Sequence, residues 1–170
     1  MAQTQTQTRW LSSEEREAWL SFGAVVELLP GVLDAQLTRD EKLTHFDYFT
    51  LAMLSEAPER TLRMTALAAR TNATLPRLSR VVSRLEAEGY VKRTPCREDR
   101  RATNATLTAA GWKKVVRAAP GHVATVRAFV IDALTPSQLK QLSQICERLL
   151  GRLDPEGRVF STQARRKEIP

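Results

Sequence analysis

Apolar positions return with a helical period along most of the chain, beginning close to the N-terminus. Between residues 19 and 37 they recur every three or four positions, which predicts an amphipathic helix. Ser12 and Glu15 have the spacing of a capping box, so we expect the helix to begin there. Pro30 and Gly31 interrupt the pattern, and we expect them to kink this helix or to split it.

The same period predicts three further helices before residue 90. One runs from about residue 44 to just before Pro58, and a shorter one surrounds residues 64–68. A break at residues 71–73 separates the short helix from the next, which Thr74 can cap and Gly89 can end. Two helices joined by so short a break have helix-turn-helix spacing.

Two short runs with partial alternation follow, at residues 90–93 and 105–107, and they predict a β-hairpin. Beyond the hairpin, the period predicts a helix over about 108–130, bent at Pro120, and a last helix that Thr135 caps. The last helix is expected to bury Leu139, Leu142, Ile145, Leu149, Leu150 and Leu153.

These elements predict a mainly α fold with a small β-hairpin, in one domain over residues 12–153. Apolar residues make up 42% of the 170 and charged residues 26%, a balance typical of a globular protein. Residues 1–11 and 154–170 are polar, and we expect them to be a disordered and a frayed tail. No run of eighteen apolar residues occurs and no secretory signal is visible, so we expect a cytoplasmic protein without a membrane span.

Positive charge is concentrated in the middle of the chain. The whole sequence carries +7, but residues 59–117 alone hold 14 Lys and Arg against 5 Asp and Glu, whereas residues 9–58 hold 4 against 9. A basic block between less basic helical segments is typical of a nucleic-acid-binding module, although a membrane-surface protein can also be basic.

Three arginines lie on one stripe of the helix that follows Thr74. Arg77, Arg80 and Arg84 are spaced i, i+3 and i+7 and point away from the apolar face, with no acid between them. Arginine pairs with guanine in the major groove or holds a phosphate, so double-stranded DNA is the expected partner. Three small residues near the N-terminus of the helix would let the backbone approach the DNA: Thr74, Pro76 and Ser79.

The tip of the hairpin is the densest charged segment. The stretch RTPCREDRRATNATLT, residues 93–108, carries four arginines and two acids in its first nine positions. A hairpin after a recognition helix is a wing, so Arg97, Arg100 and Arg101 are candidates for minor-groove or phosphate contacts. Asp99 is interpreted as a partner that orients Arg101, the alternative being an ordinary turn residue.

At these residues the sequence closely resembles the MarR family (multiple-antibiotic-resistance regulators). The matching segments are RLSRVVSRLEAEGYVKR and DRRATNATLTAAG, with Asp99 and Arg101 in the wing and Gly111 after it. The resemblance runs from about Ser12 to Leu153. It implies a winged helix-turn-helix homodimer joined through its first and last helices, with a DNA-binding lobe over about 59–110. It also implies that Arg101 enters the minor groove. Leu75 and Arg77 depart from the family's usual small or polar residues, so the operator sequence stays open.

Other chemistry finds little support in the sequence. His45 and His122 have no ligand-spaced neighbours, and no nucleotide-binding or hydrolase motif occurs, so we expect no metal, no cofactor and no enzyme. Cys96 is either a redox sensor or, as we favour, an incidental exposed thiol, and Cys146 is expected in the core. Four residues could line a cavity for a small phenolic or anionic effector, or simply be core aromatics: Phe22, His45, Tyr48 and Trp112.

The favoured hypothesis is therefore a ligand-responsive transcriptional repressor that binds a palindromic operator as a homodimer. The alternative is an architectural DNA-binding protein that responds to no effector. Preference for one palindrome over random DNA distinguishes the two, because an architectural protein discriminates little between sequences.

Overall fold

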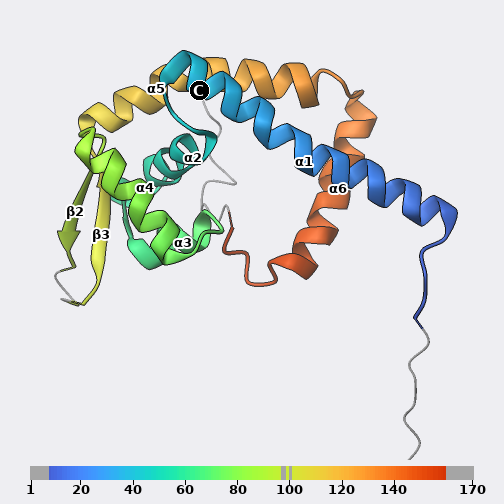
Figure 1. Ribbon diagram of the computed structural model, residues 1–170, viewed down its shortest axis with the longest axis horizontal. Coiled ribbons are helices and arrows are strands. Elements are labelled where there is room, and N and C mark those ends of the chain that lie inside the picture. The colour runs from blue at the N-terminus through green and yellow to red at the C-terminus, as the bar shows by residue number, and fades with distance from the viewer. Residues whose placement is uncertain (1–7, 97–98, 100, 160–170) are drawn as a thin grey trace, which may run out of the picture.

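The computed structural model describes residues 8–96, 99 and 101–159, and it consists of helices with one small antiparallel sheet. α1 (Ser13–Glu41) and α5 (Ala109–Val126) pack against each other along one side of the molecule, and both also pack on α2 (His45–Ser55). A short π-helical segment, η2 (Arg127–Ile131), extends α5, and α6 (Pro136–Leu153) then turns away from it (Figure 1). The expected mainly α class is confirmed.

The first helix begins as the sequence predicted. Ser12 Oγ accepts from the Glu15 N–H at 3.2 Å, and the Glu15 carboxylate accepts from the Ser12 N–H at 2.8 Å. The helix then continues without a break through Pro30 to Glu41, so of the two expected outcomes, a kink or a split, the split does not occur. A proline inside a helix removes one backbone hydrogen bond, and its ring clashes with the carbonyl of the preceding turn. The packing of the residues after Pro30 on α2 and α5 offsets this cost. α5 likewise continues through Pro120.

α1 is also long and apolar enough to cross a membrane, judged by length and composition alone. It contains no uninterrupted run of eighteen apolar residues, so the sequence did not predict a span there. The length and composition of α1 are weak evidence for a span, because helices of soluble proteins pass the same test. Its C-terminal half, moreover, packs on α2 and α5 of the same chain.

The remaining elements form a compact unit that we call the winged lobe, residues 58–108. It contains η1 (Pro58–Arg60), β1 (Thr61–Arg63), α3 (Met64–Arg70), α4 (Leu75–Ala87), β2 (Val91–Pro95) and β3 (Thr103–Leu107). The sheet order is β1-β3-β2 and both pairs are antiparallel. The hairpin of β2 and β3 was predicted and projects from the lobe in Figure 1. β1 was not predicted, since its three residues are too few to show an alternating pattern.

The core lies where α2, the helices of the winged lobe and the sheet meet. Its fully buried side chains include Leu51, Leu54, Leu67, Leu78, Val82 and Leu85. α4 therefore faces the core with one stripe, as its period predicted. That packing fixes which of its residues point outward.

Large apolar side chains remain exposed on several helices of the single chain. The N-terminal half of α1 exposes Trp19 at 61%, η2 exposes Phe129 at 61%, and α6 buries none of its residues. The expected burial of the apolar stripe of α6 is therefore wrong for one chain taken alone. The stripe has no counterpart among the described residues that covers it.

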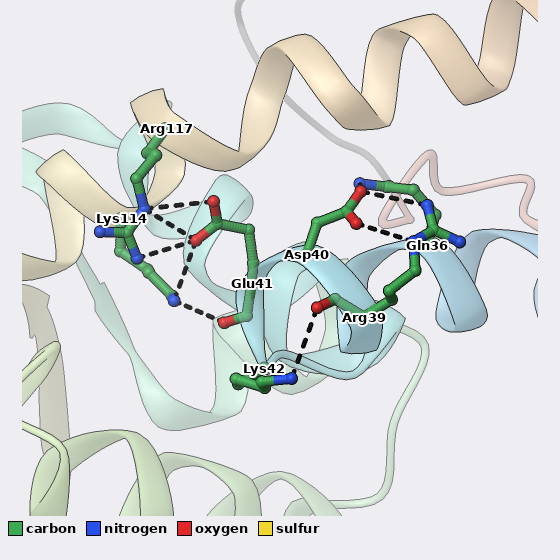
Figure 2. Close-up of polar contacts among 7 residues, drawn as sticks. All are labelled: Gln36, Arg39, Asp40, Glu41, Lys42, Lys114 and Arg117. Carbon is green, nitrogen blue, oxygen red and sulfur yellow. Dashed lines mark hydrogen bonds and ion pairs between the residues drawn. The ribbon is translucent and has the colours of Figure 1, made fainter.

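An ion cluster joins the C-terminus of α1 to α5 (Figure 2). The Glu41 carboxylate accepts from Lys114 Nζ at 3.0 Å and from Arg117 Nε at 2.9 Å, and Lys114 also donates to the Glu41 carbonyl. The hydrogen bond from Arg117 holds the pKa of the Glu41 carboxyl below its ordinary value of 4.5, although burial opposes this. Cations at a helix C-terminus are favourable, so the cluster also ends α1.

Candidate nucleic-acid interface

α4 is shaped by its two ends. Thr74 Oγ1 accepts from the Arg77 N–H, which confirms the predicted N-cap, and Pro76 lies in the first turn, where its missing N–H costs little. At the other end Gly89 has φ +78°, and the Tyr90 N–H donates to the Leu85 carbonyl at 2.8 Å. This is a Schellman ending, for which glycine is the favoured residue. The chain is thereby turned directly into β2.

The three arginines of α4 differ in what holds them. The Arg77 guanidinium lies over the Phe46 ring, 4.4 Å from its centroid, and Arg84 donates to the buried carboxylate of Asp47. Both partners belong to the first turn of α2. Arg80 is exposed, and no ion pair with the described residues holds its side chain. Arg80 is therefore the arginine of the stripe that is free to meet a ligand, a distinction that spacing alone did not reveal.

The wing is fixed to α4 by a second ion pair. Glu86 accepts from the Arg93 backbone N–H at 2.7 Å and from Arg93 Nε at 2.7 Å. These bonds hold the pKa of the Glu86 carboxyl below its ordinary value, the backbone bond being the larger cause. The strand that leads to the wing is therefore anchored to the helix. Spacing along the chain did not indicate this contact, because Glu86 and Arg93 belong to different elements.

At the tip of the wing, Asp99 acts on the backbone. Its carboxylate accepts from the Arg101 backbone N–H at 3.0 Å, and its carbonyl accepts from the Ala102 N–H at 2.9 Å. This is the contact of a turn-forming aspartate, and no bond to the Arg101 guanidinium accompanies it in the described part of the wing. Arg97 and Arg100, also predicted to contact DNA, lie outside the described residues. Arg101 itself is exposed.

A hollow separates α4 from the wing. Its walls come from the start of α3, from Leu75 and Ser79 of α4, and from the wing between Arg101 and Thr103. Arg63 and Arg93 stand at its border. The first turn of α4 and the wing thus open on one face of the lobe, and that face is rich in guanidinium groups.

The joint between the wing and α5 explains why Leu107, Thr108 and Gly111 occur together in the matching segment DRRATNATLTAAG. Thr108 caps α5 by accepting from the Gly111 N–H at 3.0 Å, and its hydroxyl donates to the Gly89 carbonyl at 2.7 Å. A Cβ atom at Gly111 would lie 2.2 Å from the Tyr90 carbonyl oxygen, so no side chain fits there. These residues therefore join the wing to α5.

The candidate effector residues are only partly brought together. The His45 and Tyr48 rings of α2 both lie against His122 of α5, with ring centroids 6.0 Å and 4.7 Å away. Phe22 instead contacts Trp19 on the exposed half of α1, and Trp112 packs under the Arg60 guanidinium, 4.0 Å from the centroid. His122, which sequence reasoning considered only as a metal ligand, is therefore a better member of the cluster than either.

Burial sets the protonation of this aromatic cluster. It lowers the pKa of His45 and of His122 below 6.5, and His45 lowers that of His122 further. Burial also raises the pKa of Tyr48. His122 Nδ1 is buried and accepts or donates no hydrogen bond among the described residues. A polar ligand can therefore form a hydrogen bond with this nitrogen.

Neither cysteine lies where the sequence predicted it. Cys96 is buried, with 6% of its surface exposed, because it closes the end of β2, so the expectation of an exposed thiol is wrong. Cys146 is half-buried on α6 and not part of the core. Over residues 8–96, 99 and 101–159, no group of three His, Cys, Asp or Glu side chains has the arrangement of a metal site.

The fold and this face define a winged helix-turn-helix protein of the kind that binds DNA. The model of the MarR family matches residues 43–102. Sco3205 of Streptomyces coelicolor, a MarR family transcriptional regulator solved in complex with DNA, is 43% identical, with 88% of this chain and 94% of that chain covered and a TM-score of 0.84. AbsC of the same organism is 37% identical over 86% and 98% of the two chains, with a TM-score of 0.81. The chain belongs to the MarR family.

The curated relatives are more distant and are matched over shorter segments. The transcriptional regulator PapX of Escherichia coli is 35% identical over 69 residues, which are 41% of this chain and 42% of PapX. The chain thus spans less than half the length of that relative. All of these similar proteins are transcriptional regulators, and the family is not one of enzymes.

Proposed function

We propose that this chain is a transcriptional repressor that binds a palindromic operator as a homodimer. The observation that carries the proposal is the hollow between α4 and the wing, which Ser79 and Arg101 line, with the exposed Arg80 next to Ser79 on α4. A helix of this kind fits the major groove, and a wing beside it reaches the flanking minor groove. Sco3205, which is 43% identical, was solved in complex with DNA, and this supports DNA binding by the present chain.

The homodimer rests on the uncovered apolar helices. Leu142, Ile145 and Leu149 of α6 are 38–55% exposed, and in the N-terminal half of α1 every residue except Gly23 is exposed. Monomeric soluble proteins rarely leave a contiguous apolar surface of this extent. A two-fold pair of chains would cover both helices and would present two recognition helices to two half-sites.

Two measurements test this proposal. Sedimentation of the full chain at micromolar concentration should give about twice 19.1 kDa, and a monomer would contradict the two-half-site arrangement. Selection from random duplex DNA should then enrich one palindrome, bound at least about a thousandfold more tightly than random duplex. A chain that binds every duplex equally would be the architectural protein instead.

The effector belongs to the same proposal. A small phenolic or anionic ligand is expected beside His45, Tyr48 and His122, since the two imidazoles can stack on a ring and His122 Nδ1 lacks a partner among the described residues. Adding benzoate or phenol should shift the imidazole resonances of both histidines and weaken operator binding. Unchanged resonances at millimolar ligand would remove this cluster as the effector site. A protein of this function acts in the cytoplasm.

A further inference from the structure

The winged lobe exposes one large apolar side chain on its surface. Leu75 is 44% exposed, whereas the other large apolar side chains found exposed in the described residues lie outside residues 58–108. Those others lie on α1, α5, η2 and α6 or just before α1, where a second chain would cover several of them. Leu75 lies on α4 and lines the hollow that faces the wing, whereas Leu150 and Leu153 of α6 line a different hollow, so the same explanation does not extend to it.

The position of Leu75 is more informative than its exposure, because single exposed leucines are common. It occupies the first turn of α4 and lines the hollow together with Ser79, one helical turn further on. On the wing side the hollow is bordered by Arg101. An exposed apolar side chain therefore lies on the face proposed to meet DNA, in a hollow that Met64, Ala102 and several guanidinium and hydroxyl groups also line.

The packing of the lobe does not require a leucine here. The buried stripe of α4 consists of Leu78, Val81, Val82 and Leu85, and the core cluster does not include Leu75. Helix propensity does not require it either, since lysine, glutamine and glutamate are comparable helix formers and would be better solvated. Its side chain is thus available to a ligand with an apolar group.

We propose that Leu75 contacts the C5-methyl group of a thymine in each half-site and thereby makes thymine a required base of the operator. In the major groove this methyl is the one apolar group on a base edge, and apolar side chains recognise it by contact. Arginine cannot make that distinction, because it reads acceptor atoms. Arg80 would then specify a guanine and Leu75 a thymine, from adjacent turns of one helix.

This inference rests on the proposed function, so its test starts from a duplex that the full chain selects from random DNA. Each thymine of that duplex is replaced singly, in both half-sites, by deoxyuridine, which removes the methyl and keeps every hydrogen bond. One position should weaken binding by about fourfold per half-site, the loss expected for burying one methyl-sized group. The other positions should change affinity little.

The Leu75 variants identify the side chain responsible. Leu75→Ala should bind the thymine duplex and the uridine duplex with equal affinity, and Leu75→Met, which keeps the volume, should retain most of the difference. Ser79 lines the same hollow but is not proposed to contact the methyl group. Ser79→Ala should therefore keep the full difference in affinity between the thymine and uridine duplexes. Because Leu75 is half-exposed, the thermal midpoints of these variants should match that of the parent chain.

The possible outcomes distinguish failure of the proposed function from failure of the Leu75 contact alone. If no duplex is enriched, the proposed function itself fails. If a duplex is enriched but no thymine is sensitive to loss of its methyl, or if Leu75→Ala keeps the sensitivity, the role of Leu75 is overturned while DNA binding stands. A sensitive thymine that becomes insensitive only in Leu75→Ala establishes the contact.

Discussion

Arg84 of α4 donates to the carboxylate of Asp47, which is buried in the first turn of α2. The other carboxylate oxygen of Asp47 accepts from the Thr44 N–H at 3.0 Å and completes the capping box of α2. One carboxylate therefore begins α2 and holds α4 beside it. An arginine that spacing assigned to the DNA-facing stripe is in fact engaged within the protein.

This contact predicts that two arginines of the same helix have different roles. Arg84→Ala should lower the free energy of unfolding by about 1–2 kcal/mol, because Asp47 is left buried with one partner fewer. Arg80→Ala, the matched control, should change stability by less than about 0.5 kcal/mol and instead weaken operator binding by about 1–3 kcal/mol. Urea unfolding and binding titrations measure both. Equal effects of the two substitutions on stability would contradict the assignment.

The cluster at Glu41 gives a second prediction. Lys114 is only 7% exposed, so Lys114→Met should leave Glu41 buried beside Arg117 alone and cost about 1–3 kcal/mol of stability. Lys113 is adjacent in sequence but exposed, and Lys113→Met should cost little. Thermal unfolding of the two variants compares them directly. A loss of similar size for Lys113→Met would show that charge, and not the buried contact, determines the effect.

The wing allows the turn role of Asp99 to be separated from its charge. Asp99→Asn and Asp99→Ala both remove one negative charge, which by itself should tighten binding to a polyanion. Only the asparagine keeps an acceptor for the Arg101 backbone N–H, so it should bind DNA more tightly than the alanine variant.

In an Arg101→Ala background the difference between the two Asp99 variants should shrink, since the turn then presents no guanidinium. Affinities measured at one fixed salt concentration complete this cycle. Equal binding by Asp99→Asn and Asp99→Ala would mean that the turn forms without the side chain.

The aromatic cluster predicts how stability depends on pH. Burial lowers the pKa of His45 and His122 in the folded chain, while Asp34 raises that of His45 and Tyr48 faces His122. The unfolded chain therefore binds more protons just below pH 6.5, and stability is lost as the pH falls from the unfolded value through the folded one. The unfolding midpoint should be lower at about pH 5.5 than at about pH 7.5. His122→Gln should reduce this difference, and an unchanged difference would exclude His122 as a contributor.

How far the sequence predicted the structure depends on the range of each interaction. Caps and helix ends at Ser12, Thr74, Gly89 and Thr135 are local, and they were found where predicted. β1 was not predicted, because its three residues pair with a strand more than forty positions away in the sequence. The continuity of α1 through Pro30 depends on packing that no local rule contains.

The site was predictable in its outline but not in its assignments. Charge and spacing identified the arginines of α4, but which of them is held by α2 depends on tertiary contacts to Phe46 and Asp47. Only some of the predicted cavity residues lie together, again because tertiary contacts decide the grouping. His122 packs against His45 although it lies 77 residues further along the chain. Periodicity assigns a residue to a face but does not identify what lies opposite it.

The close approach at Gly111 has a mechanical consequence. The Tyr90 carbonyl oxygen receives the Thr108 backbone N–H at 3.0 Å, and the first turn of α5 lies directly on it, with no side chain between them. The end of α4, the start of β2 and the N-terminus of α5 are thus joined without a compliant element. We therefore expect a rotation of α5 to move α4 and β2 with it, which in a pair of such chains would alter the separation of the two lobes and leave the shape of each unchanged.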